Sequence, residues 1–234
     1  MYFCTPAHTR TCGFVQVYIP TSGKKPMKII AMMNQKGGVS KTTLGLCLAS
    51  RWHMQGKDVA VVDCDPQASV MHWKSVQVGG SRLAGIQVYQ PESPADLVNL
   101  HELKHDYLIL DCPGTDKIIS RAALNACDVV LVPTRASAFD IRASAPTVQS
   151  ALAANKPVAY VITCVISRSD LGAEAMVALR GSSAGLVKKA MGQYTAYTRS
   201  LGEGETPLTT FPGTPACRNI EALGQAVEEV FAWR

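Results

Sequence analysis

The sequence has no apolar run that approaches the roughly 20 residues needed to span a bilayer. Its longest apolar runs, such as Val158–Val161 and Tyr107–Leu110, have only the length of strands. The first 26 residues contain scattered Thr, Pro and His and no continuous apolar core, so the pattern of a secretory signal is missing as well. These absences favour a cytoplasmic protein.

The sequence also has no C-x-x-C pair, although it contains eight cysteines. Most of the cysteines lie inside apolar runs, and no export signal places them in an oxidising compartment. We therefore expect reduced thiols in the core, and neither a disulfide framework nor a metal or iron–sulfur centre.

Positive charge is scarce outside the first residues. The formal net charge is +5, but residues 1–28 contain four bases (Arg10, Lys24, Lys25 and Lys28) and no acid, so the other 206 residues carry only +1. Global charge is therefore weak support for a nucleic-acid partner of the domain itself.

The composition is that of a folded chain, with 47% apolar and 18% charged residues among 234. This excludes intrinsic disorder for the chain as a whole. Residues 1–26 fit no secondary-structure pattern, and we expect a flexible extension there, native or not, followed by one domain over residues 27–234.

Short apolar runs alternate with helical stretches after Met27. The expected strands are Lys28–Met33, Asp58–Asp63, Ile86–Gln90, Asp106–Asp111, Asp128–Pro133, Pro157–Thr163 and Pro207–Phe211. The expected helices are Lys41–Gln55, Gln67–Ser75, Pro94–Leu103, Asp116–Cys127, Asp140–Asn155, Gly172–Met191 and Asn219–Trp233. Strands that are apolar on both faces must be covered on both faces. The pattern predicts an α/β fold, with a doubly wound, mostly parallel sheet between helices.

A glycine-containing loop lies between the first expected strand and the first expected helix, in the segment Met33–Thr43. Such a loop presents backbone N–H groups to phosphate, and the N-terminus of the helix adds partial positive charge. Lys41 is placed to reach the β- and γ-phosphates, and the hydroxyl of Thr42 to hold Mg²⁺.

The loop departs from the common pattern G-x-x-x-x-G-K-[ST] at both glycines, where Gln35 and Ser40 stand. It matches the variant K-G-G-x-G-K-[ST] at Lys36, Gly37, Gly38, Lys41 and Thr42, with Ser40 as the one departure. This variant resembles the phosphate loop of the ParA/MinD family of P-loop ATPases.

Two further segments resemble motifs of the same family. Val61–Ser69 is similar to its D-x-D-P-Q segment, and Asp106–Gly114 is similar to its Walker B strand. Carboxylates that follow adjacent parallel strands converge on the crevice where the phosphates bind. Three motifs in this order are far more specific than any one of them.

The resemblance implies roles for individual residues. It implies that ATP is bound by the loop that is formed by Lys36, Gly37, Gly38, Val39, Ser40, Lys41, Thr42 and Thr43. Lys36 resembles the signature lysine that reaches the phosphates of a partner subunit in the ATP-bound dimer. Asp65 resembles the aspartate that orients the attacking water. Thr42, Asp63 and Asp111 resemble the residues that hold Mg²⁺, directly or through water.

Ser40 is the position at which this loop differs from its family. The glycine usually found there often needs a positive φ, where a Cβ costs roughly 1–2 kcal/mol. The family resemblance implies an ATPase of weak, partner-stimulated activity, and the Ser40 departure leaves a loop with little hydrolysis as the alternative.

Within the family, the chain resembles the small plasmid-partition ATPases of the ParF type in Asp65–Trp73 and Pro133–Asp140. The resemblance implies an ATP-dependent homodimer that binds DNA non-specifically and segregates a plasmid or chromosome region with a ParB- or ParG-like centromere-binding protein. It implies a bacterial, cytoplasmic and nucleoid-associated location. A positioning protein for a protein cargo, or a nucleotide-gated scaffold, is the alternative.

Basic residues of the second half are the candidates for DNA contact. Lys188, Lys189 and Arg199 come first, with Arg168 and Arg180 in addition. The C-terminal stretch has Glu221, Glu228 and Glu229 but a single base in its last fifteen residues, which argues against a membrane anchor. We expect its apolar positions to pack on the sheet: Ile220, Leu223, Val227, Val230 and Phe231.

Overall fold

The computed structural model describes residues 26–233, and most of its strands follow the apolar runs of the sequence. The strands are β1 (Lys28–Met32), β2 (Val59–Asp63), β3 (Gln87–Tyr89), β4 (Tyr107–Asp111), β5 (Val129–Arg135), β6 (Val158–Thr163) and β7 (Gly185–Leu186). They form one sheet in the order β3-β2-β4-β1-β5-β6-β7, and every pairing is parallel. The prediction of a doubly wound α/β fold is confirmed.

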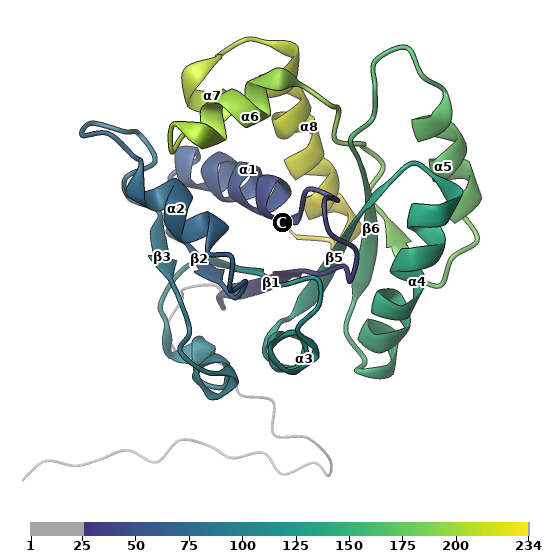
Figure 1. Ribbon diagram of the computed structural model, residues 1–234, viewed down its shortest axis with the longest axis horizontal. Helices are drawn as coiled ribbons and strands as arrows, with labels where there is room; N and C mark the ends of the chain where they lie inside the picture. Colours follow the sequence, from purple (N-terminus) through teal and green to yellow (C-terminus); the bar gives the residue numbers. More distant parts are fainter. Residues whose placement is uncertain (1–25, 234) are drawn as a thin grey trace, which may run out of the picture.

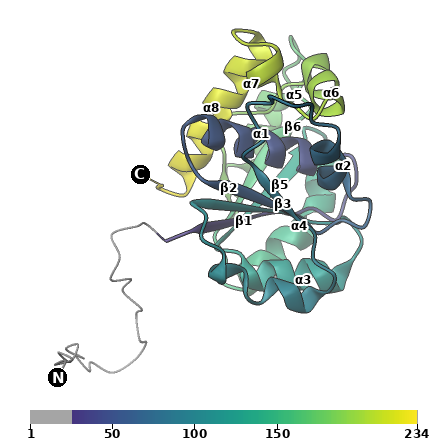
Figure 2. The same ribbon diagram turned by 90° about the vertical axis from the view of Figure 1, so that its left-hand side faces the viewer.

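Helices cover both faces of this sheet (Figures 1 and 2). One face carries α1 (Lys41–Met54), α2 (Ser69–Ser75), α6 (Thr195–Gly202), α7 (Pro207–Thr210) and α8 (Pro215–Val230). The other carries the 3₁₀ turns η1 (Pro94–Leu97) and η2 (Leu100–Glu102) with α3 (Lys117–Ala126), α4 (Ala138–Ala153) and α5 (Leu171–Leu179). Alternate residues of β1 divide between the two cores, since Ile30 and Met32 face α1 whereas Ile29 and Ala31 face the α3 side.

The structure corrects three of the expected elements. Pro207–Phe211 is not a strand, because Pro207–Thr210 forms the short helix α7, which Thr206 begins with a capping box. The helix expected over Gly172–Met191 ends at Leu179, and the strand at that edge of the sheet is Gly185–Leu186. The helix expected over Pro94–Leu103 consists of two separate 3₁₀ turns.

The C-terminal helix α8 packs as its sequence predicts. Its five predicted apolar positions all belong to, or pack against, the core on the α1 side. Arg51 of α1, which is nearly buried, pairs with Glu221 at 3.0 Å and with Glu228 at 2.7 Å. The indole of Trp52 also donates to Glu228. The carboxylates of α8 therefore fix the helix to α1.

None of the helices between residues 26 and 233 combines the length and the apolar character required to cross a bilayer. The predicted flexible extension lies outside the described residues, apart from Pro26.

Candidate functional site

The loop between β1 and α1 has a left-handed backbone at two positions. Gly38 has a φ of +69° and Ser40 has a φ of +67°. Ser40 is the N-cap of α1 and lies in the left-handed region. The predicted positive φ at this position is confirmed, and here it is adopted by a residue with a Cβ. Backbone strain of this kind is typical of functional loops.

Side chains from the strand ends hold the start of this loop. Asn34 accepts a hydrogen bond from the Lys36 amide at 2.9 Å, and its own amide group donates to the Pro133 carbonyl at 2.8 Å. Arg135, at the end of β5, donates from Nε to the Gly38 carbonyl at 3.1 Å. The loop conformation is therefore set by β1 and β5 together.

The second half of the loop is held by β6. The Thr163 hydroxyl donates to the Val39 carbonyl at 3.0 Å, and Thr163 is completely buried. Ser40 Oγ lies 3.3 Å from Cys164 Sγ. Because both halves are fixed, the backbone amides around Gly38 need little reordering to receive a ligand.

Lys41 and Thr42 open α1, where backbone N–H groups and the helix dipole favour an anion. Lys41 Nζ donates to the Lys36 carbonyl at 3.3 Å, which holds it over the loop. The Thr42 hydroxyl donates to Asp111 Oδ2 at 2.6 Å. The structure thus joins two of the three residues expected at the Mg²⁺ site by a hydrogen bond, and Asp63 lies opposite Asp111 on the neighbouring strand.

Asp111 is the candidate metal residue with an unpartnered carboxylate oxygen. Burial raises its pKa to about 7, against the hydrogen bond from Thr42, which lowers it. Its second oxygen, Oδ1, is buried and has no hydrogen-bond partner among the described residues. A buried carboxylate oxygen without a donor fits a hydrated Mg²⁺, which is bound by few carboxylates and keeps several waters. The donors at this position therefore fit the metal that the sequence implies.

Both carboxylate oxygens of Asp63, unlike those of Asp111, accept hydrogen bonds from backbone amides. Its Oδ2 accepts hydrogen bonds from the amides of Val70 and Met71 at 2.8 and 2.9 Å, and Oδ1 accepts from the Asp65 amide at 3.3 Å. Burial raises its pKa, and these backbone hydrogen bonds oppose the shift. Asp63 thus fixes the first turn of α2 and the chain that leads to it, and a metal role for Asp63 stays a prediction.

Asp65 and the phosphate loop line one cavity of about 580 Å³. Its walls come from the loop at Gln35–Thr43 apart from Lys36, from Asp65–Gln67 after β2, and from Pro113–Asp116 after β4. Gly114 leaves little room for a side chain, since a Cβ there would lie 3.0 Å from the Gln35 carbonyl oxygen. Three segments at the carboxyl ends of β1, β2 and β4 therefore meet at one crevice, as the parallel sheet predicts.

Lys36 lies outside this cavity lining and forms an ion pair with Asp140 of α4. Its side chain is 43% exposed, whereas that of Asp140 is 8% exposed. Burial alone would raise the pKa of Asp140, but the hydrogen bonds from Lys36 and Ser137 bring that pKa below its ordinary value. Lys36 is therefore held at the surface, within reach of a molecule that approaches this face.

The candidate DNA contacts lie apart from the phosphate loop in the chain and are exposed. Lys188 and Lys189 follow β7, and Arg199 lies on α6. Arg168 lies in the turn before α5, and Arg180 ends that helix. Their role in DNA binding stays a prediction.

Sequence reasoning missed the residues that hold the loop in shape. Arg135, Asp140, Thr163 and Cys164 contact the loop from about 100 residues away or more. The position of Arg135 and Thr163 could have indicated their role. Both residues end strands of the sheet, and the crevice of such a sheet forms at the ends of its strands.

Comparison with known proteins finds similarity to ATPases and to partition and positioning proteins. A family model described as an AAA domain matches residues 27–81, and one described as ATPase MipZ matches residues 81–174. The maintenance of carboxysome distribution protein A of Halothiobacillus neapolitanus is 33% identical over 132 residues, which cover 54% of this chain and 59% of that protein. The chromosome partitioning protein ParA of Caulobacter vibrioides is 30% identical over 155 residues, or 65% of this chain and 53% of that protein. The chain thus spans little more than half the length of these relatives.

A crystal structure described as a plasmid partition protein of Borrelia burgdorferi bound to AMPPNP superposes with a TM-score of 0.70. It shares 15% sequence identity and covers 87% of this chain and 99% of its own. At this identity the similarity shows a common fold.

Proposed function

We propose that this chain is a P-loop ATPase of the ParA/MinD family that binds and hydrolyses ATP to drive DNA partition. In this proposal it dimerises on ATP, binds DNA non-specifically and segregates a plasmid or chromosome region with a centromere-binding protein. The observation that carries it is the convergence of the left-handed loop, Lys41, and the Thr42–Asp111 pair on one crevice.

The chain's own residues provide what phosphoryl transfer requires, namely positioning and neutralisation of charge. The backbone amides of the loop and Lys41 hold the β- and γ-phosphates. Thr42 and the unpartnered oxygen of Asp111 would hold a hydrated Mg²⁺, which would neutralise charge on the phosphate oxygens. Asp65, on the facing wall of the cavity, orients the attacking water.

Lys36 acts in this proposal on the nucleotide of a second subunit. Its position outside the lining of its own cavity, at the surface, supports a role in trans. We expect Lys36→Ala to retain nucleotide affinity but neither to dimerise on ATP nor to hydrolyse it, and Lys36→Arg serves as the matched control. Turnover at the wild-type rate in Lys36→Ala would reject this role.

Retention on duplex DNA of random sequence tests the proposal directly. The full chain is measured with Mg·ATP, with Mg·ADP and without nucleotide, beside a form that begins at Met27, because Arg10, Lys24 and Lys25 are bases that precede the domain. We expect retention of both forms with ATP alone, and a steep loss with added salt if Lys188, Lys189 and Arg199 neutralise phosphates. Retention that is independent of nucleotide, or absent, would contradict the DNA-binding proposal.

A second candidate function is the positioning of a protein cargo. The 33% identical relative named for carboxysome distribution supports it, since such a protein would share the same nucleotide residues. A neighbouring gene for a small DNA-binding protein would favour partition. Nucleotide affinity without measurable phosphate release would instead favour a nucleotide-gated scaffold.

A further inference from the structure

Two consecutive carbonyls of the phosphate loop are bound by side chains from outside the loop. Arg135 is the last residue of β5 and donates from Nε to the Gly38 carbonyl at 3.1 Å. Thr163 is the last residue of β6, and its hydroxyl donates to the Val39 carbonyl at 3.0 Å, the nearer of its two acceptors. Arg135 and Thr163 are also direct partners in the register of β5 and β6. Two neighbouring strand ends therefore hold two neighbouring peptide units, and we call these two side chains the carbonyl clamp.

The carbonyl clamp lies on the side of the loop that faces away from the nucleotide cavity. Gly38, Val39 and Ser40 line the cavity of about 580 Å³, whereas neither residue of the clamp lines it. In a planar trans peptide, the C=O of one residue and the N–H of the next point in opposite directions. The amides of Val39 and Ser40 therefore point away from the clamp and toward the cavity.

These two amides are not used by the protein itself. Among residues 26–233, neither the Val39 N–H nor the Ser40 N–H has a protein acceptor. The left-handed φ angles of Gly38 and Ser40, +69° and +67°, bend the chain on either side of Val39. Successive N–H groups in such a bend form a concave site for an anion. The clamp thus fixes the outward side of a peptide pair whose inward side is open to phosphate.

Arg135 has no other hydrogen-bond or ion-pair partner in the part of the chain that the structure describes. Its side chain is exposed, and the nearby carboxylate of Asp140 pairs with Lys36 instead. The Nη2 atom would lie 3.7 Å from a Cβ on Gly38, so the guanidinium packs against the backbone of the loop. A charged donor on the Gly38 carbonyl polarises that peptide unit and strengthens its N–H as a donor.

We propose that Arg135 and Thr163 are positioning residues of the nucleotide site, which hold the Val39 and Ser40 amides toward the phosphates that ADP and ATP have in common. This role rests on the proposed binding of nucleotide. Backbone amides of such loops bind the α- and β-phosphates, which both nucleotides carry. Loss of the clamp therefore weakens ADP and ATP by the same factor, whereas a direct contact of the guanidinium with the γ-phosphate would affect ATP alone.

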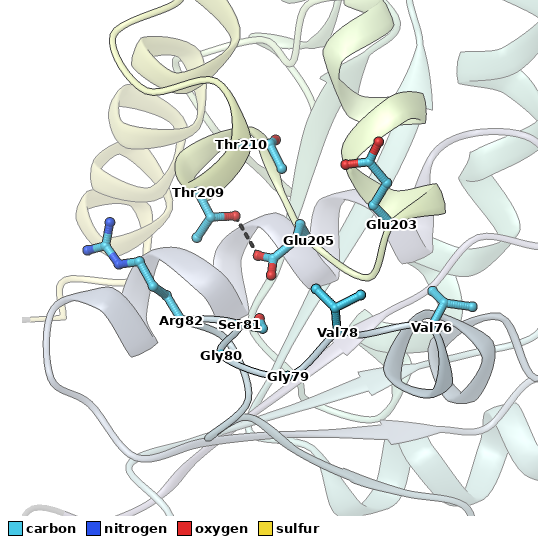
Figure 3. A pocket seen from close by; sticks show the side chains of 10 residues that line it. All are labelled: Val76, Val78, Gly79, Gly80, Ser81, Arg82, Glu203, Glu205, Thr209 and Thr210. Carbon is cyan, nitrogen blue, oxygen red and sulfur yellow. Dashed lines mark hydrogen bonds between the residues drawn. The ribbon is translucent and has the colours of Figure 1, made fainter.

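The test begins with variants of Arg135, because replacement of this exposed side chain leaves the core intact. Arg135→Met removes both the charge and the donor, whereas Arg135→Lys keeps a charged donor. Arg82→Met is the matched control for the loss of one exposed arginine. Figure 3 shows Arg82 at a separate cavity of about 560 Å³, and none of the residues that line this cavity belongs to the phosphate loop.

Calorimetric titration of the full chain with Mg·ADP and with Mg·ATP measures the affinities. We expect Arg135→Met to weaken both nucleotides about tenfold, or by about 1.4 kcal/mol, since a hydrogen bond to a charged group contributes this much or more. Arg135→Lys should lie between that variant and the wild type, and Arg82→Met should equal the wild type. In the ¹⁵N-labelled chain, nucleotide should move the Val39 and Ser40 amide protons downfield, and should move them less in Arg135→Met.

Thr163 is completely buried, so its two variants are compared after circular dichroism has shown that both fold. Thr163→Val removes the hydroxyl and should weaken ADP and ATP alike. Thr163→Ser keeps the hydroxyl and should recover the affinity. Equal losses in the two variants would remove Thr163 from the clamp, and the variants of Arg135 test the proposal even if Thr163→Val does not fold.

Three results would overturn the proposal. An effect of Arg135→Met on ATP alone would indicate direct contact with the γ-phosphate instead of positioning. Unchanged affinities in Arg135→Met, or an equal loss in Arg82→Met, would overturn the proposal and leave nucleotide binding by the wild type, and with it the proposed function, in place. A wild type that binds neither nucleotide would overturn both.

Discussion

The left-handed conformation of Ser40 makes a sharp prediction about two variants of this position. Ser40→Ala keeps the Cβ and removes the hydroxyl, which lies 3.3 Å from Cys164 Sγ. Ser40→Gly removes both. The difference between the two variants therefore isolates the cost of a Cβ at a φ of +67°.

The magnitude follows from two opposing terms. A residue with a Cβ pays roughly 1–2 kcal/mol in the left-handed region. Glycine loses more conformational freedom on folding, which costs roughly 0.5–1 kcal/mol relative to alanine. We therefore expect the free energy of unfolding of Ser40→Gly to exceed that of Ser40→Ala by about 0.5–1 kcal/mol. Ser40→Ala should fall below the wild type by at most about 1 kcal/mol, the ordinary contribution of a hydrogen bond.

Urea denaturation of the nucleotide-free proteins, followed by tryptophan fluorescence, measures these differences. A difference of 1 kcal/mol corresponds to roughly 2–4 °C in Tm for a chain of this size, which calorimetry checks independently. If Ser40→Ala is as stable as Ser40→Gly, position 40 does not hold the left-handed conformation. An unchanged nucleotide affinity in Ser40→Gly would further show that the serine does not impair the phosphate loop.

Three other variants test contacts around the same crevice. Asp140→Asn removes the ion pair that holds Lys36 on its own subunit. We therefore expect this variant to dimerise with ATP at a lower protein concentration, as measured by analytical ultracentrifugation. The double variant Asp140→Asn with Lys36→Ala should lose this gain. Thr163→Val leaves a buried carbonyl of the phosphate loop without its donor, which should lower the free energy of unfolding by about 1–3 kcal/mol, and a change below 0.5 kcal/mol in urea denaturation would count against the contact. Gly114→Ala places a Cβ 3.0 Å from the Gln35 carbonyl oxygen, so calorimetric titration should show weaker ATP binding, while undiminished affinity would mean that the two loops move apart freely.

The sequence was sufficient for the elements whose signal is local. Strands such as β2 and β6 are buried at every residue, and their continuous apolar runs made them recognisable. The segment at Pro207 was misjudged because Thr-Pro followed by small polar residues also begins a helix, and the capping box of Thr206 decides for the helix. Strand β7 has only two residues, too few for any alternation to be visible.

The residues of the candidate site also differ in whether local sequence could predict them. The phosphate loop, Asp65 and Asp111 lie at or just after the ends of strands, and they were predicted from motif and position. The partners of Lys36 and Val39 are 104 and 124 residues away along the chain, so only the folded sheet brings them into contact. The Asp63 carboxylate accepts hydrogen bonds from amides of α2. The spacing of residues in the sequence cannot distinguish this role from metal binding.

The position of β1 in the middle of the sheet has a consequence for how this crevice can change shape. The loop that follows β1 is fixed to β5 and β6 on one side, whereas the segment with Asp65 is fixed mainly through one carboxylate and a helix of seven residues. Amide hydrogen exchange should therefore be slow throughout β1 and β4 in every nucleotide state. It should change with nucleotide mainly between Asp65 and Ser75, so the crevice behaves as a fixed floor with one movable wall.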